Sequence, residues 1–252
     1  WIPFCTYSFD WVVHLAAMAG VRPSIESPEY YYDVNVMGTQ RLLDTCRKYQ
    51  VNKLIVASSS SVYGNNKTVP FKETDVVDHP ISPYAATKKA NELMCYNYHH
   101  LFDMNICCCR FFTVYGPRQR PEMAIHKFTK FILQGTTLPV FNHGNCERDY
   151  TYIDDIIQGI SLIMNQGFSF DVVNLGESKT ISTLELIRCI EASCGKKAQL
   201  NLMPSQPGDV ERTFADISHA QSTYNYQPKT TIQDGIQHFV DWYLRDSVSK
   251  AR

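Results

Sequence analysis

The stretch that decides the fold is Lys53-Leu54-Ile55-Val56-Ala57, an apolar run that ends in the serines Ser58 to Ser61. A short apolar run of this kind is typical of a strand that is buried on both faces. A helix is predicted from about Pro83 to Phe102, because Ser82 is a good N-cap and proline suits the first helical turn. Residues Ile106 to Phe111 form the next predicted strand. This order predicts parallel strands that are joined by right-handed crossovers.

The residues before this stretch extend the same pattern. Trp11 to Ala17 is another short apolar run, which predicts a strand buried on both faces. Ser27-Pro28-Glu29 indicates the start of a helix that runs from about Pro28 to Tyr49. We therefore predict an α/β fold with a doubly wound parallel sheet over residues 1–112.

The pattern loosens after Phe112. Further helices and strands are predicted at Ala124–Leu133, Leu138–Phe141, Thr151–Met164, Val172–Leu175, Ser182–Cys194 and Ile232–Arg245. These elements predict a smaller α+β lobe over residues 113–252. Residues 150–175 are expected to return to the main sheet.

Composition excludes several classes of protein. The chain has 252 residues, with 24 basic and 25 acidic side chains and no basic run, so no nucleic-acid partner is expected. The longest apolar stretch, Trp11 to Val21, is too short to span a bilayer, so no membrane partner is expected. Nine cysteines without a C-x-x-C spacing, and histidines without ligand spacing, indicate a cytoplasmic protein with no metal centre. The consecutive Cys107, Cys108 and Cys109 are interpreted as core residues of a strand.

Three groups of polar residues fall near the carboxyl ends of the predicted strands, where open α/β sheets bind ligands. They are the serine run, Tyr84-x-x-x-Lys88, and the segment from Thr113 to Arg120. Tyr84 and Lys88 are four residues apart, so they share one helix face. A tyrosine that acts as a base near neutrality needs a pKa shift of roughly three units, or about 4 kcal/mol. A lysine ammonium about 4 Å away in a partly shielded site supplies on the order of 4 kcal/mol.

Several stretches together resemble the extended short-chain dehydrogenases/reductases, the NAD-dependent epimerase/dehydratase family, and within it the UDP-glucuronate 4-epimerases. The matching stretches are His14-Leu15-Ala16-Ala17, Asn35-Val36-Met37-Gly38-Thr39, Ser58 to Gly64, Tyr84-Ala85-Ala86-Thr87-Lys88, Arg110 to Pro117 and Arg148 to Asp155. The resemblance implies an NAD-binding Rossmann fold with a substrate-binding lobe. It also implies NAD-dependent 4-epimerisation of a UDP-sugar through a 4-keto intermediate.

The resemblance implies roles for individual residues. Tyr84 would be the base, Lys88 would orient the cofactor ribose, and Ser59 would assist at the 4-hydroxyl of the sugar. Ala16 and Ala17 would line the NAD site, and Asn35 would lie near the active centre. The residues implied to bind substrate are Ser60, Ser61, Thr113, Arg120, Arg148 and Asp209.

The same resemblance bears on the reaction and the substrate. Related dehydratases and decarboxylases carry an acidic residue where Ser60 and Ser61 stand, so simple epimerisation is favoured. Thr113 and Arg120 would grip the sugar carboxylate, because a planar guanidinium makes two parallel bonds to a carboxylate. The predicted substrate is therefore UDP-glucuronate, converted to UDP-galacturonate. Two alternatives stay open: a UDP-glucose 4-epimerase, and an inactive fragment of a nucleotide-sugar epimerase.

The glycine spacing bears on the cofactor site. Since no two of the twelve glycines lie within five positions of each other, the chain contains no G-x-G-x-x-G motif. By the resemblance, roughly 60–80 residues, or two βα units, would precede Trp1 in the family. We expect that these 252 residues alone neither bind NAD tightly nor turn over. The complete protein is expected to form a homodimer through the helices that follow Ser27 and Ser82.

Overall fold

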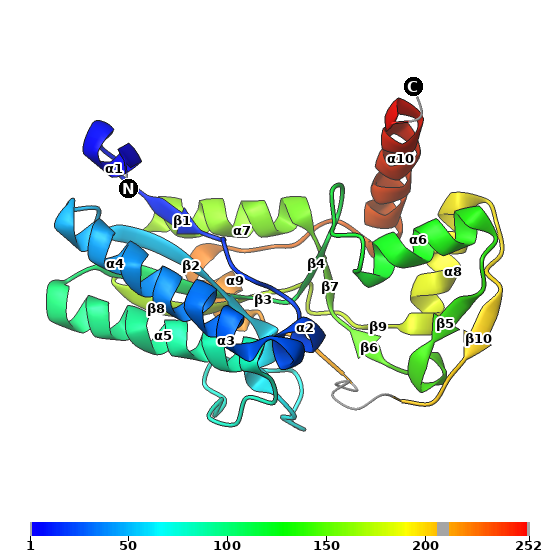
Figure 1. Ribbon diagram of the computed structural model, residues 1–252, viewed down its shortest axis with the longest axis horizontal. Helices are drawn as coiled ribbons and strands as arrows, with labels where there is room; N and C mark the ends of the chain where they lie inside the picture. The colour runs from blue at the N-terminus through cyan, green and yellow to red at the C-terminus, as the bar shows by residue number, and fades with distance from the viewer. Residues whose placement is uncertain (1, 206–211, 251–252) are drawn as a thin grey trace. The chain divides into compact units, whose positions relative to one another are not determined.

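The computed structural model describes residues 2–205 and 212–250, and the chain divides into two compact units (Figure 1). The first unit comprises residues 1–111, 159–175 and 216–226, and the second comprises 112–158, 176–215 and 227–252. The sequence placed residues 150–175 with the sheet, whereas the structure assigns 159–175 and also 216–226 to that unit. The reason is that the strand Phe170–Leu175 belongs to the sheet and the helix Ser218–Tyr224 packs against that strand.

The first unit is built on a four-stranded parallel sheet with the order β1-β2-β3-β8. Its strands are β1 (Val12–His14), β2 (Lys53–Ser59), β3 (Asn105–Phe111) and β8 (Phe170–Leu175). The predicted class, an α/β fold with a parallel sheet, is confirmed.

Strands β2 and β3 are buried on both faces, as predicted. Residues that alternate along them, such as Leu54, Val56, Ile106 and Cys108, pack in one cluster with α4 (Gly38–Lys48) and α5 (Pro83–Phe102). Cys107, Cys108 and Cys109 are all fully buried in β3, as expected for core thiols. All nine cysteines of the chain are free thiols.

Two predictions for the first unit were wrong in detail. Strand β1 covers only Val12–His14 and lies at the edge of the sheet, so Val13 is 38% exposed instead of buried. The single helix predicted from Pro28 to Tyr49 is α3 (Pro28–Tyr31), then the π-helix η1 (Tyr32–Met37), then α4. The Ser27 side chain makes no capping hydrogen bond.

The first unit also contains several short helices. They are α1 (Ile2–Thr6), α2 (Val21–Glu26), the 3-10 helix η2 (Ser60–Tyr63) and α9 (Ser218–Tyr224). Helix α9 packs against β8.

The second unit combines short strand pairs with helices. Its helices are α6 (Ala124–Gln134), the 3-10 helix η3 (Phe141–Gly144), α8 (Thr183–Cys194) and α10 (Ile232–Lys250). Its strands are β4 (Thr113–Tyr115), β5 (Leu138–Val140), β6 (Glu147–Arg148), β7 (Tyr150–Tyr152), β9 (Ile181–Ser182) and β10 (Leu200–Leu202). They pair as β4 with β7, β5 with β10, and β6 with β9. Helix α7 (Ile153–Gln166) begins in this unit.

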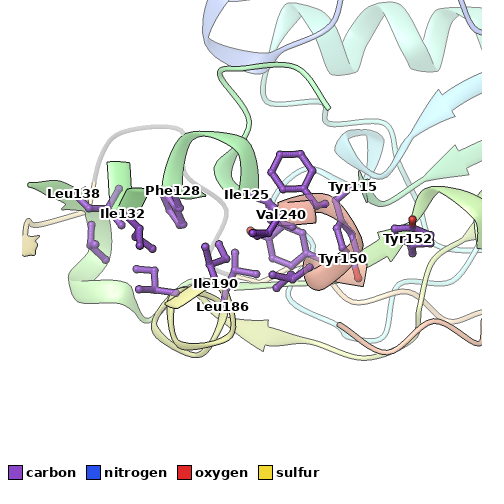
Figure 2. Packing of buried hydrophobic residues seen from close by; sticks show 14 residues of the cluster. Tyr115, Ile125, Phe128, Ile132, Leu138, Tyr150, Tyr152, Leu186, Ile190 and Val240 are labelled. Atoms are coloured by element: carbon purple, nitrogen blue, oxygen red, sulfur yellow. The ribbon is translucent and has the colours of Figure 1, made fainter. Parts of the chain in front are cut away.

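The second unit has its own hydrophobic core, which Figure 2 shows. Ile125, Phe128 and Ile132 of α6 meet residues of α8 such as Leu186 and Ile190. Helix α10 and strands β4 and β7 add further side chains to this cluster.

In the described part of the chain, no helix is long and apolar enough to cross a membrane.

Candidate active site

Tyr84 and Lys88 lie one turn apart near the start of α5. The Ser82 Oγ caps this helix by accepting a hydrogen bond from the backbone N–H of Ala85 at 3.1 Å. Lys88 is only 4% exposed, and its Nζ donates to the backbone carbonyl of Ala57 on β2 at 2.8 Å. The same Nζ lies 5.9 Å from the centroid of the Tyr84 ring. The i, i+4 spacing therefore places the ammonium beside the phenol ring.

Burial changes the electrostatics of this pair. Loss of hydration lowers the pKa of Lys88 to about 8, because burial disfavours the charged form. With the ammonium 5.9 Å from the centroid of the Tyr84 ring, a positive charge on Lys88 favours the phenolate over the phenol. A protonated Lys88 can therefore make a Tyr84 phenolate accessible.

The serine run at the end of β2 divides into three environments. Ser58 is buried, and its Oγ donates to Oε1 of Glu92 at 2.6 Å. Ser59 is the N-cap of η2, where its Oγ accepts a hydrogen bond from the backbone N–H of Ser61 at 3.1 Å. Ser60 and Ser61 are half-buried in η2. The Ser59 hydroxyl keeps its own proton for donation, since it acts as the acceptor in the cap.

Asn35 joins three segments of the first unit. It lies in the π-helix η1 and is almost fully buried. Its Oδ1 accepts from the backbone N–H of Met18 at 2.8 Å, and its Nδ2 donates to the carbonyl of Met18 at 3.0 Å. The same Nδ2 donates to Oγ1 of Thr87 on α5 at 3.0 Å. Short π-helical segments are frequent at functional sites, and here one directs an amide toward the loop after β1 and toward α5.

The loop after β1 contains Ala16 and Ala17. Ala16 is exposed and Ala17 is half-buried. His14, just before them, has its pKa lowered to about 4 by burial and by the charge of Lys88. The neutral imidazole places Nε2 3.0 Å from Oγ1 of Thr39.

Sequence reasoning missed a buried ion pair beside these residues. Arg110, at the end of β3, donates from Nε to Oε1 of Glu92 at 2.8 Å and from Nη2 to Oε2 at 2.9 Å. Its Nη1 donates to the Tyr63 hydroxyl at 3.0 Å, and that hydroxyl donates to Oδ1 of Asn174 at 2.7 Å. Ser58 completes the network on the other side of Glu92. The network links η2, α5, β3 and β8 at the carboxyl ends of the strands.

A signal for this network was present in the sequence. Arg110 follows the apolar run of β3, and Glu92 lies one turn after Lys88 on α5. Since a charged side chain at the end of a buried strand needs a partner, the pair could have been sought. Which carboxylate would meet Arg110 could not be read from the sequence, because the two residues come from different elements.

The second unit carries Thr113 and Arg120. Thr113 is half-buried in β4, where its backbone N–H donates to the carbonyl of Asp149 at 3.1 Å. Arg120 is 48% exposed in the loop after β4, and its Nη1 lies 3.0 Å from Oε1 of Glu122. Its Nη2 also lies 3.6 Å from Sδ of Met123. The predicted carboxylate-binding arginine is thus in contact with a carboxylate of its own loop.

Arg148 and Asp209 were also predicted to bind substrate. Arg148 is half-buried in β6, and its Nη1 donates to the carbonyl of Glu147 at 2.9 Å. Glu147 also pairs with Arg212, whose Nε lies 2.7 Å from Oε2. Asp209 lies outside the described residues.

Asp149 is a further buried polar residue to which the sequence analysis gave no role. Its carboxylate accepts hydrogen bonds from the backbone N–H groups of Glu177, Ser178 and Ala215 at 2.8–3.2 Å. Thr151 donates from its hydroxyl at 3.3 Å. Burial raises the pKa of Asp149 to about 6 against the opposing effect of these donors. Asp149 therefore ties the start of β7 to two loops of the second unit.

Comparison with known proteins identifies the family. The family profile described as GDP-mannose 4,6-dehydratase matches residues 4–239, which is most of the chain. The chain belongs to this family. The predicted relationship to NAD-dependent epimerases of the short-chain dehydrogenase/reductase class is confirmed.

The chain is similar to individual relatives and solved structures over most of its length. It is 43% identical to the UDP-glucuronate 4-epimerase of Thermodesulfobacterium geofontis over 240 residues, covering 95% of this chain and 74% of that protein. It also resembles the crystal structure of UDP-glucuronic acid 4-epimerase from Bacillus cereus in complex with UDP-glucuronic acid and NAD. That match has 38% identity and a TM-score of 0.88, and covers 94% of this chain and 76% of the other. The crystal structure of UDP-glucose 4-epimerase from Thermotoga maritima with UDP-glucose matches at 30% identity, with a TM-score of 0.90 and coverage of 94% and 78%.

Proposed function

We propose that the protein is an NAD-dependent UDP-sugar 4-epimerase whose substrate is a UDP-hexuronate, converted between UDP-glucuronate and UDP-galacturonate. The observation that carries the proposal is the buried Lys88 ammonium, 5.9 Å from the centre of the Tyr84 ring on the first turns of α5. The 43% identity to a UDP-glucuronate 4-epimerase supports the choice of substrate.

In this proposal Tyr84 acts as the base at the sugar 4-hydroxyl. Lys88 stabilises the phenolate, and the hydroxyl of Ser59 donates a hydrogen bond to the same oxygen. After the 4-keto sugar has turned over in the site, Tyr84 returns the proton. NAD held by the first unit would supply the acceptor for the C4 hydride and the donor for its return to the other face of the sugar.

The residues of the first unit fit a bound dinucleotide. Lys88 has three N–H donors, of which the Ala57 carbonyl uses one, so it can also serve ribose hydroxyls. Asn35 fixes the backbone of the loop after β1 at Met18, next to Ala17. We propose that Lys88, Asn35 and the Ala16-Ala17 loop hold NAD.

The substrate specificity in this proposal rests on the second unit. Thr113 and Arg120 would bind the sugar carboxylate, Arg148 the diphosphate and Asp209 the nucleotide ribose. Ser60 and Ser61 would bind the sugar. Because they stand where related dehydratases carry an acidic residue, the proposal is epimerisation and not elimination of water.

A neutral UDP-hexose is the second candidate substrate. The match to a UDP-glucose 4-epimerase at a TM-score of 0.90 favours it, and so does the contact of Arg120 with Glu122, which already places a carboxylate on the guanidinium. The third alternative, an inactive fragment of a nucleotide-sugar epimerase, is tested by the same assay.

The test is an epimerisation assay with UDP-glucuronate and UDP-glucose, done on the intact protein, which here means the complete protein with any residues that precede Trp1. We expect stoichiometric NAD in the purified protein and faster turnover of UDP-glucuronate. Tyr84→Phe should lower kcat by about 10²–10⁴-fold, which is the usual contribution of a general base. Arg120→Ala should lower kcat/KM for UDP-glucuronate by about ten- to a hundredfold and leave UDP-glucose nearly unchanged.

Two other outcomes of the assay would each reject a part of the proposal, either the substrate or the reaction. Preference for UDP-glucose together with an unaffected Arg120→Ala variant would reject the hexuronate. An absence of turnover with either sugar, with NAD bound, would reject the epimerase function.

We also propose that the protein forms a homodimer through α3, η1, α4 and α5. These helices pack against one another in the first unit, where Figure 1 labels α3, α4 and α5. Large apolar side chains on them are 43–61% exposed: Tyr30, Tyr32, Met37, Leu93, Tyr96 and Leu101. Exposed apolar patches of this kind mark interaction surfaces. Sedimentation of the intact protein and of Leu93→Glu should give a dimer and a monomer respectively, and a monomeric parent protein would reject the interface.

A further inference from the structure

Glu122 occupies one side of the guanidinium to which the proposed function assigns the sugar carboxylate. Its Oε1 lies 3.0 Å from Nη1 of Arg120, and both side chains are well exposed, at 62% and 48%. Sδ of Met123 lies 3.6 Å from Nη2 of the same arginine. Both terminal nitrogens of Arg120 are thus in contact with side chains of their own loop.

The backbone of this loop is held independently of that contact. Gln119 donates from Nε2 to the carbonyl of Val114 on β4 at 3.1 Å, and its Oε1 accepts from the backbone N–H of His126 at 3.2 Å. Nδ1 of His126 donates to the carbonyl of Gln119 at 2.6 Å. The backbone N–H of Met123 donates to the carbonyl of Arg120 at 3.1 Å. Because β4 and α6 hold the loop on both sides of Arg120, loss of the Glu122 carboxylate would change the partner of the guanidinium and not the path of the chain.

We propose that Glu122 is a specificity-determining residue that competes with the substrate carboxylate for Arg120. The inference rests on the proposed function, because it assumes that Arg120 binds the carboxylate of a hexuronate. A carboxylate that binds a guanidinium through two parallel bonds needs two N–H groups on one edge. A substrate carboxylate on the Nη1 and Nη2 edge displaces Glu122 from Nη1, and one on the Nε and Nη2 edge is repelled by the Glu122 carboxylate that stays on the same guanidinium.

This competition acts on charged sugars only. When a hexuronate binds, its carboxylate replaces that of Glu122, so the favourable contact between Arg120 and Glu122 is given up. A neutral hexose needs no place on the guanidinium and leaves the Arg120–Glu122 pair intact. Glu122 thereby weakens the binding of UDP-hexuronates relative to that of UDP-hexoses. An exposed ion pair is weak, so the displacement is a modest barrier and not a block.

The experiment compares KM for UDP-glucuronate and UDP-glucose in the intact, NAD-loaded protein and in Glu122→Gln. The glutamine keeps the shape of the side chain and removes its charge. We expect KM for UDP-glucuronate to fall about two- to fivefold relative to KM for UDP-glucose, which is the range of an exposed ion pair. Asp241→Asn is the matched control, because it removes one negative charge from an exposed side chain of α10 in the same unit. In this control the ratio of the two KM values should stay unchanged.

Failure of this inference can be told apart from failure of the proposed function. If Arg120→Ala selectively weakens UDP-glucuronate but Glu122→Gln leaves its KM unchanged or raises it, Glu122 is no competitor and only this inference is overturned. An equal fall of KM in Asp241→Asn would assign the effect to net charge and overturn it as well. If Arg120→Ala has no selective effect, the hexuronate assignment and the inference fail together.

Discussion

Arg110 and Glu92 form a buried, two-pronged ion pair between the end of β3 and the middle of α5. Nε and Nη2 of the arginine meet Oε1 and Oε2 of the glutamate at 2.8 and 2.9 Å, and both side chains are at most 4% exposed. Burial raises the pKa of the Glu92 carboxyl, but the bonds to Arg110 more than offset it, so the net pKa lies below the ordinary value. The pair is therefore ionised, and it anchors the helix that carries Tyr84 and Lys88.

Removal of the Glu92 charge should destabilise the protein strongly. Glu92→Gln leaves the Arg110 guanidinium buried without a counter-ion, which costs about 3–5 kcal/mol in comparable cases. Unfolding in urea measures the loss. The same substitution at the exposed pair, Glu122→Gln, is the control and should cost less than about 1 kcal/mol. Equal losses in the two variants would show that burial does not set the strength of the Arg110–Glu92 pair.

Lys88 should make stability rise at alkaline pH. Its pKa is about 8 in the folded protein against an ordinary value of 10.5, so the folded state releases this proton first. Between pH 8 and 10.5 the unfolded state binds more protons, and the free energy of unfolding rises with pH by up to about 3 kcal/mol from this group. The difference between wild type and Lys88→Met, measured by urea unfolding at pH 7.5 and 9.5, isolates the effect. A difference that does not change with pH would mean that Lys88 titrates normally.

Glu177 should make the stability of the protein fall as the pH rises. Burial raises its pKa to about 7 from an ordinary value of 4.5, and among the described residues its buried Oε2 has no hydrogen-bond partner. Its contribution to stability is present below about pH 4.5 and is lost as pH rises through about 7, a change on the order of 2 kcal/mol. Glu177→Gln should remove this dependence, so that the variant gains stability over wild type between pH 5 and 8. Parallel pH profiles for the two proteins would contradict the assignment.

Gly235 is required by the ring of Tyr115. A Cβ at Gly235 would lie 2.7 Å from Cζ of Tyr115 and nearer still to its hydroxyl, so Gly235→Ala should destabilise by about 1–3 kcal/mol. Gly38→Ala is the control, because the nearest atom to a Cβ there is 4.0 Å away, and alanine should stabilise this helical position by up to about 1 kcal/mol. The cost of Gly235→Ala should shrink in a Tyr115→Leu background. Thermal unfolding of Gly235→Ala, Gly38→Ala, Tyr115→Leu and the double variant Gly235→Ala/Tyr115→Leu measures these costs. If Gly235→Ala costs as much in the Tyr115→Leu background as in wild type, the ring is not the cause.

Elements with strong local signals were predicted well. Helix α5 has the predicted bounds, Pro83–Phe102, because Ser82 caps its start and Asp103 ends it in a left-handed conformation. Strands β2 and β3 were predicted from their apolar runs. The roles proposed for Tyr84, Lys88 and Ser59 came from motifs that lie on these elements, and they remain predictions for the assays above.

Elements that depend on distant partners were missed. The π-helix η1 interrupts a segment that reads as a regular helix, because Asn35 is held by Met18 and Thr87, which lie 17 and 52 residues away. Strand β7 was absorbed into the predicted helix from Thr151, since its identity as a strand depends on pairing with β4. Local periodicity carries no information about such contacts.

The amino-acid sequence by itself determined the parallel sheet, the helix that bears Tyr84 and Lys88, and the family, because these follow from short-range patterns and contiguous motifs. Only the tertiary structure decided that Arg110 pairs with Glu92, that Asp149 is surrounded by backbone donors, and that Glu122 meets Arg120. The physical reason is that the energy of a charge depends on its burial and its nearest partner, and both are set by segments that meet only when the chain has folded.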